Sequence, residues 1–191
     1  MTSSDLTLLP DGAKERAAAR VGVSIDRSTR SGPGTRVGFA CAEFNGGITD
    51  RLLSGALDAL EEAGCDLESA VLVWVPGAFE LPVVAQRLAQ SKQVDAVICL
   101  GAVIRGDTGH YEFVAGECAS GLQRVQLDTG IPIVFGVLTT ETVEQALIRS
   151  ENDGSNKGRE AAVTALHTAE VLGAVSSVKA ASRVGFAAGR R

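Results

Sequence analysis

Two hydrophobic patterns alternate along the chain between residues 36 and 172. Short apolar runs rich in β-branched residues predict strands that are buried on both faces, as in a parallel sheet. Longer stretches repeat their apolar residues every three or four positions, which predicts amphipathic helices packed against that sheet. The predicted strands are 36–41, 71–75, 96–104 and 131–138, and the predicted helices are 48–63, 80–90, 110–127, 142–150 and 157–172.

This alternation of strands and helices predicts the α/β class. Helical crossovers on both faces give a three-layer α/β/α sandwich around a central, mostly parallel four-stranded sheet. We expect one domain over residues 36–172. Residues 1–35 are predicted to be a partly disordered N-terminal arm with a short helix near 13–20, because 28–35 is rich in turn and linker residues. Residues 173–191, rich in Gly, Ala and Ser, are predicted to be a flexible C-terminal tail.

Three glycine-bearing loops follow predicted strands, at 44–47, 76–80 and 106–110. In folds of this class, ligands bind beyond the carboxyl ends of the strands, and glycine lets the backbone approach a ligand closely. The sequence therefore predicts a small-molecule site built from these loops.

His110 stands where the third of these loops enters a predicted helix. A helix start presents free N–H groups and favours negative charge, and histidine suits proton transfer near neutral pH. We therefore interpret 106–110 as a phosphate site beside an acid/base group. The alternative is that His110 caps the helix or lies on the surface. ATP and dinucleotides are disfavoured, because Asp107-Thr108 replaces the Lys-Ser/Thr of a P-loop and there is no G-x-G-x-x-G.

Two further groups of residues have both a functional and a structural interpretation. Arg149 and Lys157 flank a polar loop, where they either bind phosphate or are solvated charges. Phe44 lies in a turn, where its ring suits stacking on a flat heterocycle, whereas Phe135 suits the core equally well.

Composition narrows the class of protein. A net charge of −5 and a pI near 5.1 disfavour a nucleic-acid partner. The four cysteines lack metal-ligand or redox spacing, so we expect free thiols in a reducing cytoplasm and no metal site. The N-terminus shows no signal pattern, and we find no apolar run long enough to span a bilayer, so we expect a cytoplasmic protein with no membrane partner.

Six motifs occur in order along the chain: FNGG at 44–47, PGAFELP at 76–82, GAVIRGDTGHY at 101–111, FGVLTT at 135–140, EQA at 144–146 and NKG at 156–158. Together they resemble the 6,7-dimethyl-8-ribityllumazine synthase family over about residues 36–172. The resemblance implies a flavodoxin-like fold and a transferase of riboflavin biosynthesis. This enzyme condenses 5-amino-6-(D-ribitylamino)uracil with 3,4-dihydroxy-2-butanone 4-phosphate, releasing phosphate and water. No organic cofactor and no metal is implied.

The resemblance also implies a role for individual positions. Phe44 should stack on the pyrimidine ring, and Glu80 should bind ribityl hydroxyls. Arg149 should hold the phosphate together with the loop residues 106–108, which follow the third predicted strand. His110 should transfer protons during Schiff-base formation and phosphate elimination. The remaining substrate-binding positions are Asn45, Ala78, Phe79, Val103, Ile104, Gly106, Asp107 and Thr108.

A site shared between subunits is a further implication of the resemblance. Phe135 and Lys157 should come from the neighbouring subunit, and Glu160 should orient His110 across that interface. The family forms homopentamers, some of which close into an icosahedral 60-mer, and the short loop before Lys157 favours that shell. Riboflavin synthase is a candidate partner. Gly109 stands where many relatives carry a bulkier residue or proline. A non-catalytic flavin- or lumazine-binding protein, or a shell protein on the same scaffold, is the alternative function.

Overall fold

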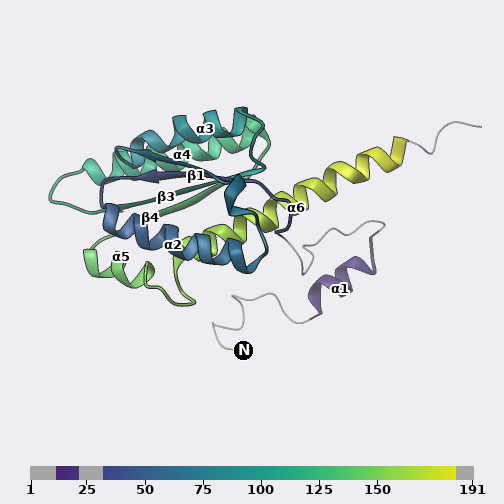
Figure 1. The fold of residues 1–191 in the computed structure, drawn as a ribbon, viewed down its shortest axis with the longest axis horizontal. Helices are drawn as coiled ribbons and strands as arrows, with labels where there is room; N and C mark the ends of the chain where they lie inside the picture. The colour runs from purple at the N-terminus through teal and green to yellow at the C-terminus, as the bar shows by residue number, and fades with distance from the viewer. Residues whose placement is uncertain (1–11, 22–31, 184–191) are drawn as a thin grey trace, which may run out of the picture.

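The structure, a computed structural model, describes residues 12–21 and 32–183. One sheet of four parallel strands has the order β2-β1-β3-β4, with β1 at Val37–Ala42, β2 at Val71–Val75, β3 at Ala96–Ile104 and β4 at Ile133–Thr140. The helices are α1 (Ala13–Ala18), α2 (Gly46–Glu62), α3 (Leu81–Gln90), α4 (His110–Thr129), α5 (Val143–Arg149) and α6 (Lys157–Arg183), with 3-10 turns η2 (Leu67–Ser69) and η3 (Ala78–Glu80). The predicted α/β sandwich is confirmed (Figure 1).

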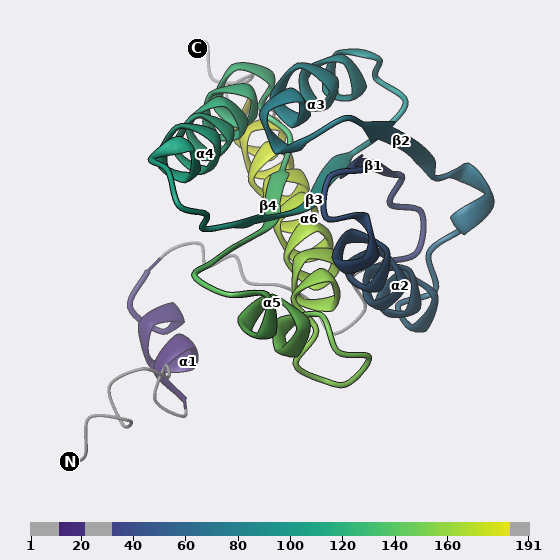
Figure 2. The ribbon, with the colours of Figure 1, turned by 90° about the vertical axis from the view of Figure 1, so that its left-hand side faces the viewer.

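The two helix layers follow from the alternation of side chains along β3, because successive residues of a strand point to opposite faces. Ile98 and Leu100 pack in one core cluster with α2 and α6. Val97 and Cys99 pack in a second cluster with α3 and α4. Figure 2 shows α3 and α4 on one side of the sheet and α2, α5 and α6 on the other. A sheet covered on both faces requires the continuous apolar runs that predict these strands.

The strand order reverses between β1 and β3, and this reversal positions the site. The chain leaves β1 toward α2 on one face of the sheet and leaves β3 toward α4 on the other. Loops that diverge in this way open a crevice at the carboxyl ends of the two strands, where doubly wound folds bind their ligands.

Helix α6 is longer than its sequence pattern predicts. It runs through Gly173 to Arg183, so the predicted helix end at Leu172 is wrong. A glycine costs a helix about 1 kcal/mol relative to alanine without stopping it, and no proline follows before Arg183. The first turns of α6 are buried against α2 and the sheet, whereas no side chain from His167 to Val178 is buried. This second half projects beyond the sheet (Figure 1).

Within the described part of the chain, one helix is long and apolar enough to cross a membrane by length and composition alone. It is the α6 segment Lys157–Val178, with a mean hydropathy of 1.3. The expectation that no such run exists overlooked this segment, whose apolar residues include many small alanines. Core helices of soluble proteins pass the same test, and Ala162 and Ala165 are fully buried in the core.

The ends of the chain are described only in part. Helix α1 buries none of its residues. Residues 1–11, 22–31 and 184–191 lie outside the described residues. The disorder of the N-terminal arm and the flexibility of the last residues therefore stay predictions. From β1 to α5, the bounds of the predicted helices and strands agree with the structure to within two residues.

Candidate active site

A cleft of about 640 Å³ lies at the crevice between β1 and β3. Its walls come from the loops after β1, β2 and β3 and from the start of α4, so the three glycine-bearing loops meet as predicted. This volume is typical of a site for a small molecule. The lining residues are Phe44, Pro76, Gly77, Ala78, Phe79, Glu80, Ala102, Val103, Ile104, Gly106, Thr108, His110, Tyr111 and Val114.

Two aromatic rings of the cleft are largely exposed, Phe44 at 72% and Phe79 at 56%. Exposed rings in a cleft suit stacking on a flat ligand, which removes them from water. Asn45 holds the loop that carries Phe44. Its backbone is left-handed, with φ of 59°, and its side-chain amide donates a hydrogen bond of 2.8 Å to the carbonyl oxygen of Ala102. Asn45 therefore ties the loop after β1 to β3, and it is not among the lining residues.

The β3–α4 loop, residues 105–109, is exposed throughout, and His110 begins α4. Gly109 occupies the N-cap position without a side-chain hydrogen bond. Thr108 Oγ1 accepts a long hydrogen bond of 3.5 Å from the N–H of His110. The first amides of an α-helix have no partner within the helix, so this loop presents donors and a favourable dipole to an anion beside the imidazole. Asp107 lies in the loop but outside the lining of the cleft.

Phe135 lies away from the cleft of its own chain. It pairs with Cys99 in the sheet, whereas Ile104 of the cleft pairs with Thr140. Phe135 is therefore five positions along the strand from the level of Ile104, a distance of about 16 Å. Phe135 is 40% exposed on β4, which is an edge strand of the sheet. Its ring is therefore accessible to a second molecule but does not reach this cleft.

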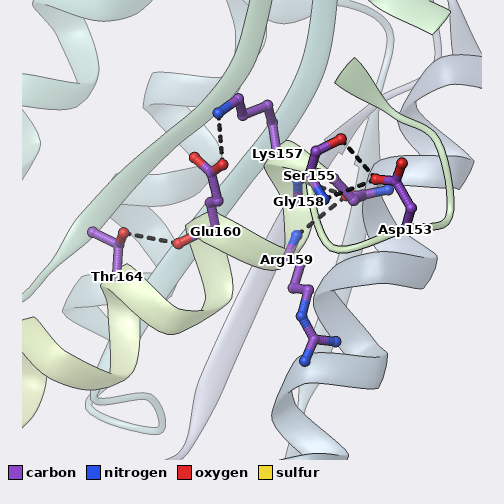
Figure 3. Close-up of polar contacts among 8 residues, drawn as sticks. Asp153, Ser155, Lys157, Gly158, Arg159, Glu160 and Thr164 are labelled. Carbon is purple, nitrogen blue, oxygen red and sulfur yellow. Dashed lines mark hydrogen bonds and ion pairs between the residues drawn. The ribbon is translucent and has the colours of Figure 1, made fainter. Parts of the chain in front are cut away.

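Arg149, Lys157 and Glu160 also lie outside the lining of the cleft. Arg149 ends α5, and its guanidinium donates a hydrogen bond of 3.0 Å to the carbonyl of Gln145 in the same helix. Lys157 Nζ and Glu160 Oε1 form an ion pair of 2.6 Å in the first turn of α6 (Figure 3). The predicted site residues thus divide into two sets, one meeting in the cleft and one on the β4–α5–α6 side of the chain.

Asn156, the first residue of the NKG motif, is fully buried and fully hydrogen-bonded. Its amide donates to the carbonyls of Arg51 and Ser150, at 3.1 Å each. Its Oδ1 accepts hydrogen bonds from the N–H groups of Gly158 at 2.8 Å and Arg159 at 3.2 Å, which caps α6. This side chain therefore joins the C-cap residue of α5, the start of α6 and helix α2.

The glycines around Asn156 are required by close packing. A Cβ at Gly158 would lie 1.8 Å from the carbonyl oxygen of Leu52 in α2. A Cβ at Gly55 would lie 2.5 Å from the side chain of Asn156. The start of α6, which carries Lys157, is therefore held rigidly against α2.

Residues 34–173 match the model of the 6,7-dimethyl-8-ribityllumazine synthase family. The chain belongs to this family. Two relatives that bear this name come from Edwardsiella ictaluri (strain 93-146) and Sodalis glossinidius (strain morsitans). Each is 53% identical over 146 residues, which are 76% of this chain and 94% of the relative. The resemblance found in the sequence, with its enzyme class, is confirmed.

Among solved structures, a GDP-L-fucose synthetase from Naegleria fowleri bound to NADP aligns with 85% of this chain. This chain spans about half of that protein, 51%, at a TM-score of 0.39 and 12% identity. A likeness of this size supports no argument about the ligand of the lumazine synthase cleft.

Five lining residues of this lumazine synthase cleft were not among the predicted site residues: Pro76, Gly77, Ala102, Tyr111 and Val114. Val114 follows His110 by four positions, a spacing that places both on one helix face, so the sequence contained a signal for it. Pro76 and Gly77 lie within a predicted glycine-bearing loop. Ala102 carries no such signal, because it is an apolar strand residue like its neighbours.

The cysteines play no visible part in the cleft. Cys41, Cys65, Cys99 and Cys118 are free, as predicted. Burial raises the pKa of Cys41 and of Cys118 to about 12, and it also raises the pKa of Cys99. These thiols are therefore protonated and unreactive near neutral pH. Within the described residues, no group of three or more His, Cys, Asp or Glu side chains could hold a metal ion.

Proposed function

We propose that this chain catalyses the lumazine synthase reaction, the condensation of 5-amino-6-(D-ribitylamino)uracil with 3,4-dihydroxy-2-butanone 4-phosphate. The observation that carries the proposal is the meeting of three loops in one cleft, with exposed Phe44 and Phe79 near the exposed amides of an α4 start that carries His110. Family membership supplies the two substrates. No cofactor is needed, because an amine, a ketone and a phosphate leaving group are reactive in themselves.

The residues of the cleft suit the two substrates. Phe44 stacks on the pyrimidine ring, and Glu80, beside Ala78 and Phe79, binds hydroxyls of the ribityl chain. The backbone of Val103 and Ile104 meets the edge of the pyrimidine.

The β3–α4 loop binds the second substrate. Gly106, Asp107 and Thr108 hold its phosphate at the start of α4, where the helix dipole favours an anion. The amine of the first substrate attacks the ketone of the second, and the adduct loses water to give an imine. His110 moves the protons of this step and of the following phosphate elimination. Ring closure then releases the second water.

A neighbouring copy of the chain completes the site. Phe135, Arg149, Lys157 and Glu160 are partly or largely exposed and lie outside the cleft lining, which supports their contribution to the cleft of a second subunit. Arg149 then binds the phosphate, and Phe135 covers the pyrimidine ring. Glu160 orients His110 from the other side of the interface. The same interface makes the protein a homo-oligomer, a pentamer or a 60-mer built from pentamers.

The decisive experiment mixes both substrates with the purified protein and follows lumazine fluorescence together with phosphate release. Both signals should rise in equal amounts. A protein that binds lumazine or riboflavin but releases no phosphate would instead be the non-catalytic binding protein on this scaffold.

Assembly and location are measured separately. Light scattering separates a pentamer from a 60-mer through their masses, and the short α5–α6 loop leads us to expect the 60-mer. Co-sedimentation with riboflavin synthase tests that partner. Cell fractionation should place the protein in the cytoplasm.

A further inference from the structure

We propose that Arg105 is a positioning residue for His110: its guanidinium closes the β3–α4 loop onto the first turn of α4 and onto the chain after β4. The proposal rests on the lumazine synthase activity for its kinetic readout. Its physical content is a clamp of three contacts that fixes the start of the helix carrying His110.

The backbone of Arg105 is fixed first. Its N–H donates a hydrogen bond of 2.9 Å to the carbonyl of Thr140, which continues the pairing of β3 with β4. The side chain then forms ion pairs with Glu112 in α4 and, at 2.6 Å, with Glu141 after β4. Its guanidinium carbon lies 4.1 Å from the centre of the Tyr111 ring, within cation–π range.

The clamp acts where the loop has weak local support. The N-cap of α4 is Gly109, which makes no side-chain hydrogen bond. Arg105 contacts Tyr111 and Glu112, the two residues that directly follow His110 in the first turn. The ion pair links Arg105 and Glu112, the two residues that flank 106–111, and so closes this segment into a loop. Closing a loop reduces the number of conformations in which the imidazole and the phosphate amides are misplaced.

The second carboxylate links this turn to α5. Glu141 accepts from Arg105 Nε, and its own N–H donates 2.9 Å to Oε1 of Gln145 in α5. Tyr111 lines the cleft, so the clamp also fixes part of the cleft wall. The Arg105 side chain thus connects the ends of β3 and β4 with the start of α4 and, through Glu141, with α5.

Arg105 is not placed to bind the substrate phosphate itself. Two carboxylates contact its guanidinium, and it does not line the cleft, although Ile104 and Gly106 on either side do. The hydrogen bond to Glu112 raises the pKa of Arg105, and the same bond lowers the pKa of Glu112, so both partners are charged at neutral pH. Arg149, by contrast, contacts a neutral carbonyl, and its charge is not matched by a carboxylate in the described structure.

The test compares Arg105→Gln, Arg105→Lys, Glu112→Gln and the double variant Arg105→Gln/Glu112→Gln with the intact protein. The matched control is Arg36→Gln, because Arg36 forms a similar two-contact pair with Asp95, at 2.8 and 3.1 Å, just before β3. We expect Arg105→Gln to lower kcat about tenfold by misplacing the imidazole, with little change in KM for the phosphorylated substrate. Arg105→Lys should recover part of kcat, since it keeps the charge but loses the planar fork. Arg36→Gln should leave kcat unchanged.

The double variant separates a clamp from two independent effects. If Arg105 acts through Glu112, the double variant should have the same kcat as Arg105→Gln alone. Effects that multiply would overturn the proposal. So would a raised KM for the phosphorylated substrate at constant kcat, which would make Arg105 a phosphate ligand. An equal loss of kcat in Arg36→Gln would mean that losing any such ion pair lowers activity through general destabilisation, and it would also overturn the proposal.

Hydrogen exchange keeps this proposal distinct from the proposed function. Amides of residues 106–111 should exchange faster in Arg105→Gln than in the intact protein, and not in Arg36→Gln. This readout needs no substrate. An inactive intact protein with the expected exchange pattern would overturn the proposed reaction and keep the clamp, whereas an active protein with unchanged exchange would overturn the clamp.

Discussion

The β3–α4 loop and the α5–α6 loop, residues 150–156, each lead into a helix that begins with a predicted site residue, but they are held by different interactions. The first is exposed from Arg105 to Gly109 and is tied by surface ion pairs. The second ends in Asn156, a buried neutral amide with four hydrogen bonds. The loop proposed to bind phosphate thus keeps exposed backbone donors, whereas the loop that leads to Lys157 is anchored at its end by a buried side chain.

The largest difference should appear when a methyl group is added at the start of each of the two helices, at Gly109 before α4 and at Gly158 in α6. Gly158→Ala places a Cβ 1.8 Å from a backbone oxygen and should cost at least about 3 kcal/mol of unfolding free energy, at the upper end of overpacking costs. Gly109→Ala meets nothing nearer than Glu112 Oε2 at 4.0 Å, at a φ of −68°, and should be tolerated. Denaturant unfolding measures both. Similar losses would mean that the two loops are equally packed.

Subunit mixing tests whether the two regions form one site from two chains. His110→Ala should lower kcat about a hundredfold without abolishing activity, because substrate orientation still contributes. Arg149→Ala should mainly raise KM for the phosphorylated substrate, by about tenfold or more.

The mixture is assayed with the phosphorylated substrate well below its KM, where each variant alone has low activity. A refolded equal mixture of these two variants should then recover about a quarter of the intact activity, since random assembly gives that share of sites both residues. Mixtures of Arg105→Gln with His110→Ala serve as the control, because both residues lie in one chain and no intact site can form. No recovery in the His110 and Arg149 mixture would place both residues in the same subunit.

The buried amide should matter for stability more than its exposed neighbour. Asn156→Ala removes the α6 cap and leaves four backbone groups without this partner, and it should cost about 2 kcal/mol. Ser155→Ala removes one exposed hydroxyl that bonds Asp153, and it should cost less than about 0.5 kcal/mol. Thermal unfolding distinguishes these values, and equal costs would remove the special role of Asn156.

The smallest expected effect concerns pH at the ion-paired loop. Arg105 lowers the pKa of Glu112, so this carboxylate stabilises the fold at pH values above its unfolded pKa. That contribution disappears as the pH falls through the lowered folded pKa. Glu112→Gln should therefore be slightly less stable than the intact protein at pH 7, with the difference absent in strong acid. A difference that persists in acid would exclude the charge as its cause.

The sequence predicted the sheet and the cleft well for a physical reason. Buried parallel strands must be continuously apolar, and the glycine-bearing loops lie directly after them, so strand ends and site loops are visible together. Phe44, Phe79 and His110, which the sequence assigned to one site, line the same cleft. Their substrate roles are proposals.

Other features depend on contacts that no local pattern encodes. The position of Phe135 about 16 Å from Ile104 follows from strand register, which periodicity does not give. Arg105 pairs with Glu141, which lies 36 positions away in the sequence. Charged residues of this kind are usually interpreted from sequence as solvated surface residues, so the pair was not predicted. The continuation of α6 past Gly173 was missed because composition was taken as evidence for a tail.

The projecting half of α6 offers an exposed helix for chemical attachment away from the rest of the domain. The helix starts on the side of the cleft loops and runs away from them to Arg183 (Figure 1). A dye attached to the last described turns of α6 would lie at the end of the domain opposite the cleft. Labelling of these turns therefore leaves the cleft of the same chain open.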